Sequence, residues 1–130
     1  MARKTKAAEL IEFEVAFYEK LAVKYPDFVD ALIPLAEAYT RRGEHDRGLA
    51  IDLKLTQLRG EDPIVWYNLG CSYSLLNRID EACEALSRSI LLGYRDLNHL
   101  RSDPDLTNLH RSPNYRRLLD QLSSRKVAER

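Results

Sequence analysis

The sequence is poor in cysteine, carries no net charge and contains no long apolar run. It has two cysteines, Cys71 and Cys83, whereas a disulfide framework needs more of them in a smaller secreted chain. The 20 basic and 20 acidic residues cancel, which argues against the basic excess of a nucleic-acid-binding protein. No apolar run approaches the roughly 20 residues that span a bilayer, and none follows the basic N-terminus as in a secretory signal. We therefore expect a cytoplasmic protein that binds neither nucleic acid nor a membrane.

What is present is the composition of a folded domain. Hydrophobic residues make up 45% and charged residues 31% of 130 residues, which is enough chain to bury a core without disulfides. The two cysteines are then best interpreted as small apolar residues with reduced thiols.

The most informative pattern is an internal similarity at a spacing of 34 residues. Residues 29–39 are followed by Gly43, and residues 63–73, which have the same order of bulky and small side chains, are followed by Asn77. Leu32, Leu35, Ala36 and Tyr39 correspond to Trp66, Leu69, Gly70 and Tyr73. These positions have the spacing i, i+3, i+4 and i+7 of one helix face, and a fixed period indicates a helical repeat.

One segment competes with an all-helical interpretation. Residues 48–55 alternate apolar and polar side chains, as a half-buried strand would. A lone strand would leave its backbone groups without partners, so a helix is expected there. We expect an N-terminal helix at 6–25, repeats at 27–60 and 61–94, capping helices at 95–124, and a polar tail at 125–130 that frays from about Ser123.

The pattern Trp66, Leu69-Gly70, Tyr73, Ala82 and Leu86 resembles the tetratricopeptide repeat. Residues 10–122 carry the resemblance, although Gly48 replaces a usual alanine and Asp52 stands where a bulky apolar residue belongs. The first helix looks like the second half of a repeat. Residues after Gly93, with Asp103-Pro104-Asp105 and Ser112-Pro113, resemble the unit that closes some bacterial arrays of this family. The resemblance implies an all-α, right-handed superhelical stack of antiparallel helix pairs, an α-solenoid.

In this family the first helices of successive units line a concave groove that holds a partner's peptide or helix. The residues that the resemblance places in this groove are Asp30, Ile33, Glu37, Arg41, Ile64, Tyr67, Asn68, Cys71 and Ser74. Ile33 and Tyr67 are the expected contact residues, or else they only cover the edge of the first helices. Family members that dock chaperone tails grip a carboxylate with Lys and Asn at the positions held here by Ile33 and Glu37. Since Glu37 would repel a carboxylate, that ligand is not expected.

Catalytic and metal-binding interpretations find little support. His45, His99 and His110 lie in different predicted elements without the spacing of metal ligands. Asp103-Pro104-Asp105 lacks the later positions of a calcium loop and is better interpreted as a helix start. Cys71 and His99 could form a nucleophile and base, but no third group is suggested to orient them. We predict that the protein is not an enzyme and uses no cofactor or metal.

The predicted function is that of a scaffold or adaptor for another protein. The alternatives are self-association into a homo-oligomer through the N-terminal helix, where Ile11, Phe13, Phe17 or Tyr18 could contact another subunit, and a holdase-like accessory role. Pro34 lies inside a predicted helix, where it removes a backbone donor. It either shapes the groove or is a harmless kink.

Overall fold

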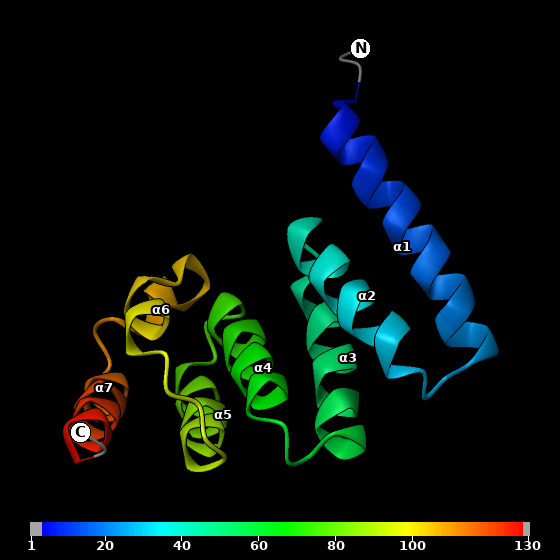
Figure 1. Ribbon diagram of the computed structural model, residues 1–130. Helices are drawn as coiled ribbons and strands as arrows, with labels where there is room; N and C mark the ends of the chain where they lie inside the picture. Colours follow the sequence, from blue (N-terminus) through cyan, green and yellow to red (C-terminus); the bar gives the residue numbers. More distant parts are fainter. Residues whose placement is uncertain (1–3, 129–130) are drawn as a thin grey trace.

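The computed structural model describes residues 4–128, and the side chains of residues 4–125, as helices joined by short turns without any strand. The helices are α1 (Lys6–Lys24), α2 (Val29–Arg41), α3 (His45–Leu58), α4 (Pro63–Leu75), α5 (Ile79–Leu91), α6 (Leu97–Ser102), the 3-10 helix η1 (Pro104–Leu109) and α7 (Pro113–Ala128). From α1 to α5 each helix packs against the next, and α7 packs against α5 (Figure 1). The expected all-α class is confirmed. Within the described range, no helix is both long and apolar enough to cross a membrane.

The helix boundaries follow the local sequence. Asp62 caps α4, since its Oδ1 accepts a hydrogen bond from the Ile64 N–H at 2.9 Å, and Pro63 takes the first helical position. Gly43 and Asn77 follow α2 and α4 with φ of +82° and +59°, the left-handed conformation that ends many helices. The alternating segment 48–55 lies inside α3, so the expected helix is confirmed there.

The 34-residue spacing of the sequence reappears in the helices. α2 and α4 have 13 residues each and begin at Val29 and Pro63, while α3 and α5 begin at His45 and Ile79. α4 and α5 approach closely at Gly70, where an added Cβ would lie 2.8 Å from the Leu86 side chain. The small side chain at this position is therefore a packing requirement, as the sequence predicts.

The core is divided among the helix contacts. Its largest cluster joins α4 and α5 to the C-terminal helices and buries Leu100, Leu106, Leu109 and Leu122. α1 contributes less to the core than the other long helices, because Val15 is its one fully buried residue among those described. One face of α1 remains open to solvent, since Leu10, Phe13 and Phe17 are 55%, 67% and 49% exposed.

The C-terminal helix extends further than expected. α7 continues to Ala128, so the expected end of the capping helices at residue 124 is corrected to residue 128; residues 129–130 lie outside the described residues. Leu122 is fully buried, and the Arg125 guanidinium donates a hydrogen bond to the Ile90 carbonyl at 3.1 Å. These two contacts attach the last turns to α5 despite their polar sequence.

Candidate functional site

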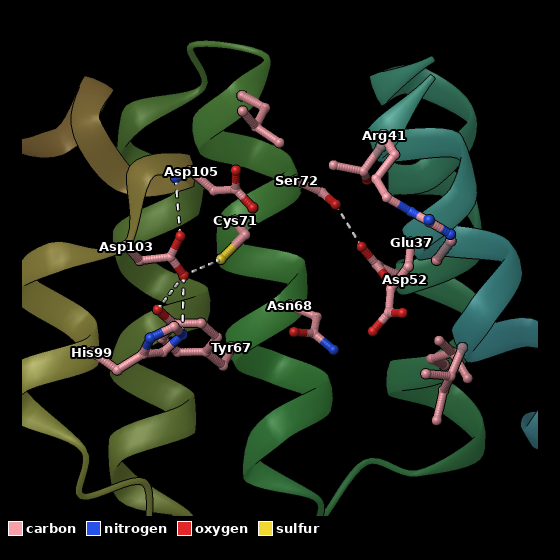
Figure 2. A pocket seen from close by; sticks show the side chains of 15 residues that line it. Glu37, Arg41, Asp52, Tyr67, Asn68, Cys71, Ser72, His99, Asp103 and Asp105 are labelled. Atoms are coloured by element: carbon pink, nitrogen blue, oxygen red, sulfur yellow. Dashed lines mark hydrogen bonds and ion pairs between the residues drawn. The ribbon is translucent and has the colours of Figure 1, made fainter. Parts of the chain in front are cut away.

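A cavity of about 340 Å³ opens between α2 and α3 on one side and α6 and η1 on the other. α4 forms the wall between them, as Figure 2 shows. The lining residues are Ile33, Ala36, Glu37, Thr40, Arg41, Asp52, Leu55, Tyr67, Asn68, Cys71, Ser72, Leu75, His99, Asp103 and Asp105. Its size is at the small end of the range of about 300–1,000 Å³ that ligand pockets occupy.

Six of the nine groove residues expected from the sequence lie in this cavity: Ile33, Glu37, Arg41, Tyr67, Asn68 and Cys71. The other three do not line it. Asp30 and Ile64 are exposed in the first turns of α2 and α4, whereas the cavity follows the later turns of these helices. Ser74 is fully buried, and its carbonyl accepts a hydrogen bond from the Asn108 side-chain amide in η1.

Asp103 connects the helices on one side of the cavity. It is 7% exposed, and its Oδ1 accepts a hydrogen bond from the Asp105 N–H at 2.9 Å, so it caps η1 as the helix-start interpretation predicts. Its Oδ2 lies 2.6 Å from the Tyr67 hydroxyl, 3.3 Å from His99 Nε2 and 3.7 Å from Cys71 Sγ. The carboxylate therefore fixes the position of η1 against α4 and α6.

Tyr67 belongs to the wall of the cavity. It is 4% exposed, its ring stacks on Tyr94 with centroids 4.6 Å apart, and its hydroxyl donates to Asp103. Burial and the bond to Asp103 raise the pKa of the Tyr67 hydroxyl far above its usual range. Tyr67 lines the cavity as expected for a groove residue, but one face of its ring is covered by Tyr94, so it offers a partner little contact area. Of the two expected contact residues, Ile33 is the more accessible, since it is only half-buried.

The environment of Cys71 disfavours a reactive thiolate. Burial, followed by the charges of Asp103 and Asp105, raises the pKa of the Cys71 thiol well above its usual range. His99 contacts Asp103, and no hydrogen bond joins its imidazole to the thiol within the described part of the chain. A nucleophilic cysteine needs a lowered pKa and a base in contact. Asp103 is the third group that the sequence did not reveal, but it binds the thiol and the imidazole separately.

Among the residues that the structure describes, Cys71, Asp103 and Asp105 form a group that could hold a metal ion, with ligand atoms within 4.8 Å of one another. Both oxygens of Asp103 already accept hydrogen bonds from the protein, one from the Asp105 backbone and one from Tyr67. Capping and hydrogen bonding therefore account for this cluster.

Asp52 lies on the opposite side of the cavity. This α3 residue is only 4% exposed, and the Ser72 hydroxyl donates a hydrogen bond to its Oδ2. Burial raises the pKa of Asp52 to about 6, the Ser72 bond opposes this rise, and the charge of Glu37 adds to it. No lysine or arginine within the described range forms an ion pair with this carboxylate.

The cavity carries an excess of negative charge. Four carboxylates line it, those of Glu37, Asp52, Asp103 and Asp105, against one arginine. That arginine, Arg41, forms an ion pair with Glu14 of α1. Burial, followed by the neighbouring Asp103 charge, raises the pKa of Asp105, which indicates that the acidic groups affect one another. Such a site attracts cations and repels anions.

Sequence reasoning missed the acidic half of this site. Asp52 was visible as a polar residue at a position where the repeat pattern has an apolar one, but nothing indicated which side chain it would contact. Asp103 and Asp105 were recognised only as a helix start. Their approach to α4 depends on the packing of η1 over residues 36 positions away, as in the bond from Tyr67 to Asp103.

No family model matches the chain. A 69-residue stretch, 53% of the chain, is 36% identical to a chloroplastic protein of Arabidopsis thaliana. That stretch corresponds to 21% of the length of the Arabidopsis protein, so the chain spans about a fifth of this relative.

Proposed function

We propose that the protein is an adaptor that holds a peptide or helix of a partner protein in the cavity. In this proposal α2–α3 and α4–α5 are two units of a right-handed tetratricopeptide-like stack, α1 is half a unit, and α6 to α7 form a cap. One observation carries it. Cavity residues on α2 and α4 correspond at the 34-residue spacing, Ile33 with Tyr67, Glu37 with Cys71 and Arg41 with Leu75. The first helices of the two pairs, α2 and α4, thus line one open cavity with equivalent faces.

The lining supports binding rather than chemistry. Ile33 provides a half-buried apolar contact, and the exposed Glu37 provides a charge. The Asn68 side chain extends into the cavity (Figure 2), and its amide has no hydrogen-bond partner among the described residues. A free amide can donate to and accept from the backbone of an extended peptide. In this proposal the protein is not an enzyme and acts in the cytoplasm.

A selection from a phage-displayed random peptide library tests this function. Synthetic versions of the selected peptides are then titrated by fluorescence anisotropy against the wild type and variants. Ile33→Ser and Asn68→Ala should each weaken binding at least tenfold. Ile64→Ser is the matched control, because Ile64 is 53% exposed on α4 and lies outside the cavity. Circular dichroism checks that each variant is folded. Peptides that bind all three folded variants like the wild type would overturn the proposal.

A second candidate function is self-association, favoured by the open face of α1. Leu10, Phe13 and Phe17 lie at i, i+3 and i+7 on this face, and the rings of Phe13 and Phe17 stack with centroids 6.2 Å apart. Contiguous exposed apolar groups of this kind often mark an interface. Multi-angle light scattering at micromolar concentration should show a dimer that Phe13→Asp converts to a monomer. A monomeric wild type would refute this candidate.

A further inference from the structure

We propose that the cavity receives the cationic side chain of a lysine or arginine from the bound peptide. The carboxylates of α2 and α3 would hold this side chain from one side, and those at the start of η1 would hold it from the other. This inference rests on the proposed function and names the chemistry of its ligand. The basic residue would be the specific element of recognition, because two walls of the cavity present acidic groups toward a shared space (Figure 2).

The buried Asp52 carboxylate is the strongest indication. A carboxylate that is 4% exposed normally has a cationic partner or several hydrogen-bond donors, because removing it from water is costly. Here one serine hydroxyl donates to one of its oxygens, and the described chain supplies no cation. Asp52 nevertheless lines an open cavity rather than a closed core. A cation that enters the cavity would supply the missing counter-charge.

The groups that face Asp52 add to this field. Glu37 comes from α2 and lines the same cavity, and its charge adds to the rise in the pKa of Asp52 that burial causes. Across the cavity lie Asp103 and Asp105, with His99 attached to Asp103. The arginine of the lining, Arg41, is already paired with Glu14. Acidic groups that line one concave site add to one another's attraction for a positive charge.

The size and the apolar part of the lining favour a single long side chain. The cavity volume of about 340 Å³ is large enough to admit one long side chain of the bound peptide or helix. Ile33, Leu55 and Leu75 supply apolar surface beside the acidic groups. Lysine and arginine carry an apolar stem that ends in a charge, and they bury the stem against such surface.

The peptides selected above provide the test. We expect lysine or arginine to be enriched at one fixed peptide position, and its replacement by glutamine to weaken binding at least tenfold. Glu37→Gln and Asp52→Asn should weaken the basic peptide at least fivefold and leave the glutamine peptide unaffected. Asp30→Asn is the matched control, since it removes one charge from α2 outside the cavity and should change the dissociation constant less than twofold. Raising the salt concentration should weaken the basic peptide selectively.

The outcomes separate this inference from the proposed function. Peptides that need Ile33 and Asn68 but carry no essential basic residue would overturn the cationic ligand and leave the adaptor function in place. Equal losses for Asp30→Asn and Asp52→Asn would also overturn it, because the attraction would then come from net charge alone. Peptides that lose no affinity in the Ile33 variant and none in the Asn68 variant would overturn the adaptor function itself.

Discussion

Replacing Asp52 by asparagine should stabilise the protein at neutral pH. Burial raises the pKa of Asp52 from 3.8 to about 6, which means that folding disfavours its charged form. Each pKa unit corresponds to about 1.4 kcal/mol, so the ionised Asp52 lowers the free energy of unfolding by about 3 kcal/mol. Asparagine keeps the shape and still accepts the hydrogen bond from Ser72, but it carries no charge.

The sign of the pH dependence follows from the same shift. Because the folded protein holds the proton more tightly than the unfolded chain, the contribution of Asp52 to stability is complete below about pH 4. It is lost as the pH rises through about 6. The stability gained by Asp52→Asn should therefore be about 2 kcal/mol larger at pH 7.5 than at pH 4.

Urea unfolding followed by far-ultraviolet circular dichroism measures both proteins at each pH. The difference between variant and wild type isolates Asp52, because all other titrating groups are shared. Ser72→Ala is the companion variant. It removes the donor to Asp52 and should cost about 1–3 kcal/mol at pH 7.5. An equal effect of Asp52→Asn at pH 4 and pH 7.5 would refute the reasoning, since the charge could not then be its cause.

Three further predictions concern packing, the backbone and a thiol. Gly70→Ala should lower the free energy of unfolding by about 1 kcal/mol in urea titrations. The added Cβ would lie 2.8 Å from the Leu86 side chain, and this clash outweighs the helix propensity that alanine adds. A gain in stability would contradict the close packing of α4 and α5. Pro34→Ala should raise the free energy of unfolding by up to about 3 kcal/mol, seen as a higher melting temperature, because it restores a backbone donor inside α2. If the proline shapes the cavity, the same variant should also weaken peptide binding, and a destabilised Pro34→Ala would show that α2 needs the proline. The Cys71 thiol should react with a disulfide reagent at pH 8 far more slowly than a free cysteine, because burial raises its pKa. The measurement uses the Cys83→Ser variant, in which Cys71 is the remaining thiol, and rapid modification of this folded variant would contradict the prediction.

Much of the fold follows from the sequence because its signals are local. α4 begins at Asp62-Pro63, where the Asp62 side chain accepts a hydrogen bond from a backbone N–H two residues later. Gly43 and Asn77 end α2 and α4 by adopting the left-handed conformation. The helix over residues 48–55 also follows, since no partner strand is available for it. The extension of α7 to Ala128 was missed, because the hydrogen bond from Arg125 to Ile90 joins residues 35 positions apart.

The candidate site was likewise predicted only in part. Of the nine groove residues that the family resemblance implied, six line the cavity, since the 34-residue period fixes which faces of α2 and α4 are equivalent. It could not show that Tyr67 is covered by Tyr94, nor that Ser74 is buried beside η1. Those outcomes depend on how the C-terminal helices fold back over α4.

By itself, the sequence determined the helical class, most of the helix ends and the equivalence of α2 and α4, because capping, left-handed turns and periodic apolar faces act over short distances. Only the tertiary structure decided the charge of the cavity. It placed Asp52 against Ser72 and brought Asp103 to Tyr67, contacts between residues 20 and 36 positions apart. Whether a carboxylate is a solvated surface group or a buried, unpaired charge depends on what packs around it, and no local pattern carries that information.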